Sequence, residues 1–178
     1  EDRTRGDALL ALEQIYAKIG AEDALQRTLL ARLALETSQD ARAEILFRLA
    51  SLVLESDRPK SLGYAVDALA AKADYAEARA LVDSFLTDPQ VRSTAANALI
   101  AAYRAQWNYD ELARLHERLV AFASEGVART EARIAHAAVL SADLGNFAQA
   151  ARVIADGILE DPTHEGLRAE LLRLTEST

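Results

Sequence analysis

The stretch "DLGNFAQAARVIADGILEDPTH", residues 143–164, contains a turn followed by one complete helical pattern. Gly145-Asn146 predicts the turn, because glycine takes up the left-handed backbone conformation at no steric cost and asparagine caps the helix that follows. Apolar residues then recur at helical spacing as far as Asp161-Pro162. The helix is expected to end there, because proline disfavours the helical conformation of the residue before it. A helix pair of this length cannot bury its apolar face alone, so the stretch predicts neighbouring helices that cover it.

The whole chain has the composition of an all-α protein. Its 178 residues are 51% hydrophobic and 27% charged, as in ordinary folded domains, and they include only seven Gly and three Pro. Apolar residues recur at helical spacing nearly throughout, and no stretch alternates long enough to form a strand. Cutting the pattern at its turn signals predicts about ten helices joined by short turns.

The charge of the chain argues against a nucleic-acid partner. The formal net charge is −8, and the basic residues are scattered between acidic ones rather than gathered in a patch. No apolar run approaches the roughly 20 residues that a membrane-spanning helix needs. The absence of cysteine excludes disulfides and thiolate metal sites but fits the cytoplasm and the periplasm equally. The start at Glu1 rather than Met suggests a processed protein or a piece of a longer one.

Comparison of the chain with itself indicates an internal duplication. Leu12 aligns with Leu99 and Gly20 with Trp107, both at an offset of 87 residues. Apolar positions in the later part of each half align after small adjustments, with one mismatch. We therefore expect a single helical-repeat domain of residues 1–178, with duplicated halves at 1–88 and 89–178.

Residues 131–164 resemble a tetratricopeptide repeat. This unit is 34 residues long, the period of that family. Phe147 opens its second helix, the large Ile154 is followed by the small Gly157, and Pro162 closes the unit, all at the spacings of the family. Weaker copies of the pattern occupy residues 6–35, 43–71 and 93–123. The resemblance implies a right-handed α-solenoid of antiparallel helix pairs, similar to the divergent repeat proteins of bacteria.

Two predicted helices depart from a plain two-helix repeat. Residues 74–86 and 163–175 each add a fifth helix to one half. We expect the first to interrupt the regular stacking and the second to cap the end of the array. In the second, Leu167, Leu171 and Leu174 form a narrow apolar stripe backed by charged residues, as a terminal helix with one solvated face requires.

No constellation of residues predicts catalysis, a cofactor or a metal site. The three histidines, His116, His136 and His164, lack a second ligand three or four residues away. There is no Gly-x-Ser-x-Gly elbow and no glycine-rich phosphate loop. We expect His116 to pack inside its helix pair, and carboxylates such as Glu13 to lie on solvated faces beside Arg or Lys. The protein is therefore expected not to be an enzyme.

The resemblance places the first helix of each pair along a groove. The residues that we expect to contact a partner there are Arg48, Asn97, Ala101, Arg104, His136 and Val139. The basic, Asn-bearing clamp with which similar domains hold the C-terminal peptides of chaperones is absent. Most groove positions are small or apolar, which suits a helix or an extended peptide better than a bare carboxylate.

Trp107 and Tyr109 stand together in a predicted turn. We favour packing of both rings beneath the adjacent helix pair, because Tyr109 matches the aromatic residue that opens a second helix in the family. The alternative is an aromatic hot spot for binding on an exposed edge.

The leading hypothesis is a non-enzymatic scaffold that binds a peptide or helix of a bacterial partner protein in the groove. Two other functions remain open. The chain fits a sensor or regulatory arm of a larger bacterial regulator, and it also fits a module that assembles with itself into an oligomer through the solenoid ends.

Overall fold

The computed structural model describes residues 2–176, and it describes the side chains of residues 6–176. In this part of the chain there are ten α-helices and no strand, which confirms the all-α fold and the expected number of helices. None of the described helices is both long and apolar enough to cross a membrane. The chain divides into two compact units, residues 1–102 and 103–178, with the boundary inside helix α6 (Arg92–Ala105). The expected duplication at residues 88 and 89 does not coincide with this boundary and stays a prediction.

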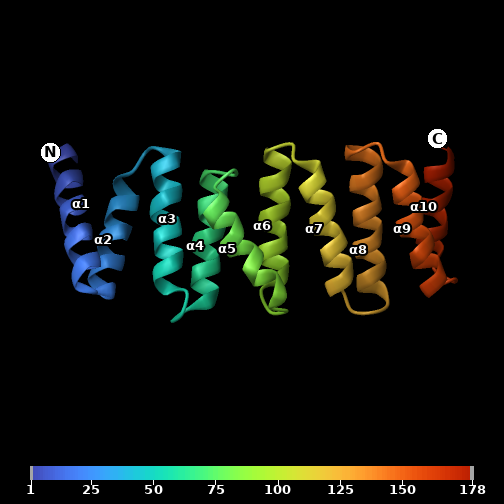
Figure 1. Ribbon diagram of the computed structural model, residues 1–178, viewed down its shortest axis with the longest axis horizontal. Coiled ribbons are helices and arrows are strands. Elements are labelled where there is room, and N and C mark those ends of the chain that lie inside the picture. The colour runs from blue at the N-terminus through green and yellow to red at the C-terminus, as the bar shows by residue number, and fades with distance from the viewer. Residues whose placement is uncertain (1, 177–178) are drawn as a thin grey trace. The chain divides into compact units, whose positions relative to one another are not determined.

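Unit 1, residues 1–102, is a series of helices in which each helix from α1 to α5 lies beside the next one in the chain (Figure 1). Its elements are α1 (Asp2–Ile19), α2 (Glu22–Leu35), α3 (Gln39–Val53), α4 (Arg58–Ala71), α5 (Ala76–Ser84), the 3-10 turn η1 (Phe85–Thr87) and most of α6. Leu29 of α2 packs with Ile45 and Leu49 of α3, and all three are nearly inaccessible to solvent. This cluster joins the second helix of one pair to the first helix of the next.

Side-chain caps fix two of the helix starts in unit 1, and an aspartate side chain closes the turn before a third. Ser38 accepts a hydrogen bond from the Ala41 amide at 3.4 Å, and Asp57 accepts one from the Lys60 amide at 3.0 Å. In the sequence, Asp88-Pro89 also predicts a helix start, with Asp88 as the cap and proline in the first helical position, but the structure places it in the turn that leads into α6. The Asp88 carboxylate accepts from the Gln90 amide at 3.0 Å and closes a tight turn, so α6 begins only at Arg92.

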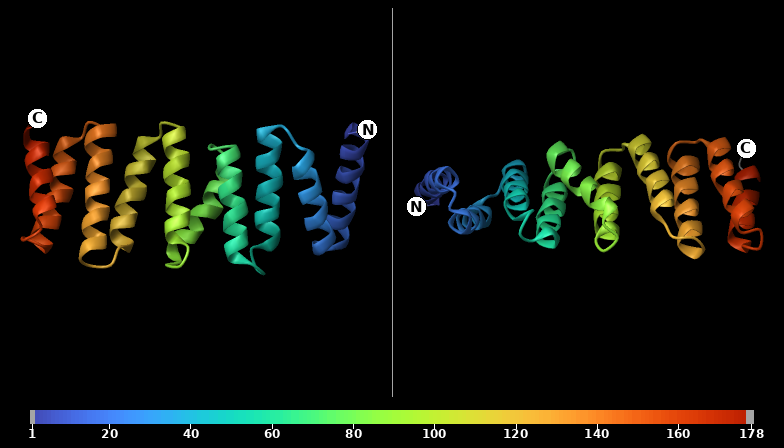
Figure 2. Two further views of the ribbon diagram at one scale, coloured as in Figure 1. Left: turned by 180° about the vertical axis from the view of Figure 1, so that it is seen from behind. Right: turned by 60° about the horizontal axis from the view of Figure 1, so that its bottom comes forward.

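Unit 2, residues 103–178, follows with α7 (Tyr109–Phe122), α8 (Val127–Ala138), the π-helical turn η2 (Val139–Asp143), α9 (Phe147–Glu160) and α10 (Glu165–Glu176). Helix α10 contacts both α9 and α8, and α9 and α10 lie side by side in Figures 1 and 2. Leu167 and Leu174 of α10 are buried, as the apolar stripe in the sequence predicts. A Cβ atom on Gly157 would lie 3.1 Å from a methyl group of Leu167, so this small residue permits the close approach of α9 and α10.

Three turns between helices share one backbone geometry. Gly20, Trp107 and Gly145 have φ angles of 69°, 55° and 63°. Each is followed by the residue that caps the next helix, and Asn108 and Asn146 make that cap with their side chains. Trp107 therefore occupies a glycine position of the turn, as expected, although the left-handed conformation costs a residue with a Cβ atom roughly 1–2 kcal/mol.

The turn after α8 differs from the other two by one extra residue. The amides of Ala21 and Asn108 donate to the carbonyls of Tyr16 and Tyr103, five residues earlier, at 3.0 and 2.9 Å. The amide of Asn146 instead donates to Leu140, six residues earlier, at 2.7 Å. The π-helical turn η2 holds this additional residue, as single π turns inside α-helices commonly do. Before η2, α8 therefore aligns with α6 at an offset of 37 residues, whereas after it the offset is 38.

Candidate protein-interaction surface

The contact residues expected in unit 1 lie on exposed helix faces. Arg48 of α3 is exposed, and so are Asn97 and Ala101 of α6. Asn97 and Ala101 are four residues apart and therefore share one face of α6, while Leu99 between them is completely buried. The faces of α3 and α6 that we expect to be exposed are therefore exposed in the structure. Contact of these residues with a partner stays a prediction.

Arg48 is anchored by a buried carboxylate at the junction of three helices. Glu13 of α1 accepts hydrogen bonds from the guanidinium groups of Arg32 on α2 and Arg48 on α3. The Glu13 side chain is only 1% exposed, so the expectation that it lies on a solvated face is wrong. Two cationic partners compensate the cost of burying this charge. Sequence reasoning missed Arg32, because the two residues are 19 positions apart and no local spacing signals the contact.

The contact residues expected after α6, His136 of α8 and Val139 of η2, are not on an exposed face. His136 is 5% exposed and Val139 is 2% exposed, so the expectation that both lie on an exposed face is wrong, although His136 lines a small cleft. Their contact with a partner stays a prediction. The cause of their burial is the residue inserted in η2. The expectation aligned α8 with α6 at an offset of 38 residues, but ahead of η2 the offset is 37. A slip of one residue turns a helix by about 100°, which moves a side chain from the exposed face to the core.

With the corrected offset, the two expected residues match buried positions of α6. His136 takes the position of the buried Leu99, and Val139 takes that of the buried Ala102. The exposed counterpart of Ala101 is Ala138. Ala138 is therefore the residue of α8 that replaces Val139 in the expected set.

His116 of α7 and His136 of α8 form a buried, electrostatically linked pair in unit 2. His116 is 8% exposed, which confirms that it packs inside its helix pair. Burial lowers the pKa of His116, the repulsion that a protonated His136 would exert and the charge of Arg104 lower it further, and Asp143 opposes the shift. Burial also lowers the pKa of His136, and Glu117 opposes that shift. Unit 2 therefore favours the uncharged form of both rings.

A small cleft of about 310 Å³ lies above His136 between α7 and α9. His136, Ala113 and Leu140 form its buried floor, and its rim carries polar side chains. The rim includes Asp110, Arg114, Glu117, Asn146 and Gln149. Arg114 is paired with Glu111 at 2.5 Å, and the rim also carries the carboxylates of Asp110 and Glu117.

Arg104, Trp107 and Tyr109 lie at the start of unit 2. The Arg104 side chain is 54% exposed and lies 3.8 Å from the carboxylate of Asp143. Trp107 is 76% exposed, so the favoured expectation that its ring packs beneath a helix pair is wrong. Its ring meets that of the half-buried Tyr109 edge to face, with centroids 6.2 Å apart. The turn conformation explains the exposure, because a left-handed residue after α6 directs its side chain away from the helix.

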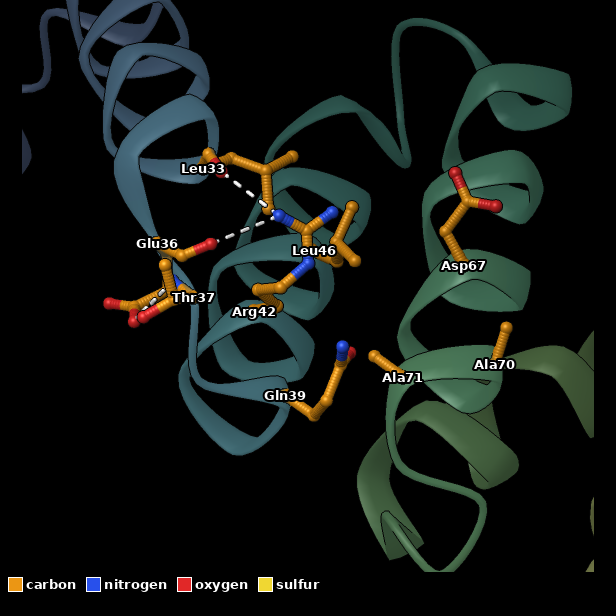
Figure 3. Close-up of a pocket in the computed structure, with 9 residues that line it drawn as sticks. All are labelled: Leu33, Glu36, Thr37, Gln39, Arg42, Leu46, Asp67, Ala70 and Ala71. Carbon is orange, nitrogen blue, oxygen red and sulfur yellow. Dashed lines mark hydrogen bonds between the residues drawn. The ribbon is translucent and has the colours of Figure 1, made fainter.

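A shallow cavity of about 690 Å³ lies between the end of α2, α3 and α4 in unit 1 (Figure 3). Arg42 donates hydrogen bonds to the carbonyl oxygens of Leu33 and Glu36, both at 3.2 Å, and so completes the end of α2. Asp67 and Ala70 of α4 line the opposite wall (Figure 3). The lining side chains include no nucleophile paired with a base, and Arg42 acts here as a structural cap.

The described side chains of residues 6–176 include no group of three or more His, Asp or Glu residues that could hold a metal ion. What the arrangement offers is exposed helix surface: Arg48 on α3, Asn97 and Ala101 on α6, and Trp107 after it. No family model and no curated protein matches this chain.

Proposed function

We propose that this protein is a non-enzymatic interaction scaffold, a right-handed solenoid of tetratricopeptide-like helix pairs that holds a helix or extended peptide of a bacterial partner protein. The observation that carries the proposal is the exposed face of α6. There Thr94, Asn97 and Ala101 present small or polar groups, while the opposite side of the helix is buried. A face without bulky side chains leaves room for the side chains of a ligand.

The first helix of the preceding pair supports the same function. Glu44, Arg48 and Ser51 of α3 are exposed on one face, and Phe47 beside them is half-buried against Tyr75, with ring centroids 5.4 Å apart. Arg48 is held by Glu13, so its charge is presented in a fixed place and little side-chain entropy is lost on binding. These groups suit a peptide that combines apolar residues with an acidic one.

The test fills the two faces with bulky charged side chains. We expect Ser51→Arg and Ala101→Arg each to weaken capture of the partner at least about tenfold, since both introduce a large side chain where the ligand would lie. The measurement is affinity purification with the tagged parent and variants, followed by titration of the captured protein against each form.

Ala80→Arg is the matched control. Ala80 is exposed on α5, outside the faces of α3 and α6, and it undergoes the same change of residue. The proposal holds if capture survives Ala80→Arg and is lost with the other two variants. Equal capture by all four forms would refute it.

A further inference from the structure

The outer side of α1 carries an apolar stripe that is open to solvent. Ala8, Leu12, Ile15 and Ile19 follow one another at helical spacing, and all four are exposed. The exposed fractions of the three large side chains are 38%, 53% and 66%. Six of the eleven exposed large hydrophobic residues in the described chain lie on α1 and α2, so exposed apolar surface is concentrated there.

Alignment of α1 with α3 shows what kind of contact this stripe makes. At an offset of 37 residues the buried Glu13 matches the buried Ala50. The positions Ala8, Leu12 and Ile15 then match Ile45, Leu49 and Leu52 of α3, which pack against α2. The corresponding residues of α6, at an offset of 87, are also buried: Ala95, Leu99 and Ala102. The stripe of α1 is therefore a helix-docking face that no helix of the described chain covers.

We propose that a second copy of this chain covers the stripe, through an antiparallel contact between α1 and the same helix of the second copy. The stripe runs from small to large along the helix, from Ala8 to Ile19. When the two copies are related by a two-fold axis that passes beside residues 13 and 14, the two α1 helices run antiparallel. Ala8 then lies opposite Ile19, and Leu12 lies opposite Ile15. The smallest residue thus meets the most exposed large one, which is the self-complementarity that a two-fold interface requires.

The polar flank of the stripe is self-complementary in the same register. Asp7, Gln14 and Lys18 are exposed along one edge of the stripe, in the order acid, amide, base. The two-fold axis brings Asp7 of each copy near Lys18 of the other and places the two Gln14 side chains together at the centre. Neither Asp7 nor Lys18 has an ion-pair partner within the described residues. The dimer contact therefore gains two ion pairs and breaks none that the described side chains of residues 6–176 make.

The first experiment measures the mass of the chain by sedimentation equilibrium over a wide range of concentration. The parent is expected to approach twice the chain mass of 19.3 kDa as its concentration rises. Ile15→Glu is expected to stay monomeric, because it places two carboxylates in the apolar contact. Leu159→Glu is the matched control, since Leu159 is 81% exposed on α9 in unit 2, and it should dimerise as the parent does.

A charge exchange tests the antiparallel register. Asp7→Lys and Lys18→Asp should each weaken the dimer about tenfold at low salt, because symmetry changes both ion pairs at once. A mixture of the two variants should recover the affinity of the parent, since two lysines of one variant then face two aspartates of the other. The chain has no cysteine, so Gln14→Cys should form a disulfide between two copies on mild oxidation.

The proposal is overturned if the parent is monomeric at every concentration, if Ile15→Glu dimerises as the parent does, or if the mixture fails to recover. Binding of a synthetic α2 peptide, residues 22–35, to a monomeric parent would instead assign the stripe to a partner helix. These variants leave the exposed faces of α3 and α6 unchanged, so failure of this dimer would not affect partner capture.

Discussion

Helices α6 and α8 each lead into a turn of the same backbone geometry, and the two turns differ by one residue. Both helices lead into a left-handed residue and an asparagine cap, Trp107-Asn108 after α6 and Gly145-Asn146 after α8. One extra residue in η2 shifts the register of α8 ahead of it. As a result, His136 occupies the core position that Leu99 occupies in α6.

The comparison shows that equivalent positions keep their burial or backbone conformation even when the residue type changes. The same core position accepts a leucine in α6 and an imidazole in α8, and the same turn position accepts a glycine or a tryptophan. Each less favourable choice carries a cost, as polar burial in one place and backbone strain in the other. Substitutions that exchange the two residues measure these costs.

The largest effect is expected from exchanging the core residues. Leu99→His should lower the free energy of unfolding by about 3 kcal/mol, because it removes a fully buried leucine and buries an imidazole where the fold supplies an apolar site. His136→Leu should leave the free energy of unfolding unchanged or raise it by up to about 1 kcal/mol. Urea unfolding followed by circular dichroism at about pH 7.5, where both histidines are neutral, measures both. A large loss in His136→Leu would show that the two positions are not equivalent.

A smaller effect is expected at the turn. Trp107→Gly should raise the free energy of unfolding by about 1 kcal/mol, because glycine adopts the φ of 55° without strain and the exposed ring contributes little burial. Gly145→Ala should lower it by about the same amount. No atom lies within 4 Å of a Cβ placed at Gly145, so the cost there is conformational.

Trp107→Ala is the control for the turn, since alanine keeps the backbone strain and removes only the ring. Its stability should match that of the parent in the same unfolding experiment. Destabilisation by both Trp107→Gly and Trp107→Ala would mean that the indole ring stabilises the turn through Tyr109.

The helices and most turns of this chain could be predicted from the sequence, because apolar spacing and turn residues are local signals. The stripe of α10 and the close approach at Gly157 follow from such spacing and are present. The start of α6 lies at Arg92 rather than directly after Asp88, because the Asp88 side chain closes a turn ahead of the helix. The burial of Glu13 depends on Arg32 and Arg48, which reach it from two other helices.

The exposure of the expected contact residues follows from the sequence where the repeat is regular and not where it is interrupted, and their contact with a partner stays a prediction. Asn97 and Ala101 lie on an exposed face because α6 is an uninterrupted α-helix. His136 and Val139 were assigned to the wrong face, because a single inserted residue leaves the apolar pattern intact on each side of it. The offset between the two copies is 37 residues along α6 and α8, and it is 38 residues from the turn onward, α7 and α9 included.

The smallest expected effect of the buried histidines on the free energy of unfolding appears only at acid pH. Burial lowers the pKa of His116 and of His136 below the ordinary value of 6.5, so the folded protein binds fewer protons than the unfolded chain in that range. The contribution of the two neutral histidines to the free energy of unfolding is therefore fully present above pH 6.5. It falls as the pH drops from there through the lowered pKa values of the folded protein. Urea unfolding between about pH 7 and pH 5 should show this decline in the parent and a shallower one in His136→Leu, which removes one titrating ring and its charge beside His116. An equal decline in both would mean that protonation of His136 is not coupled to folding.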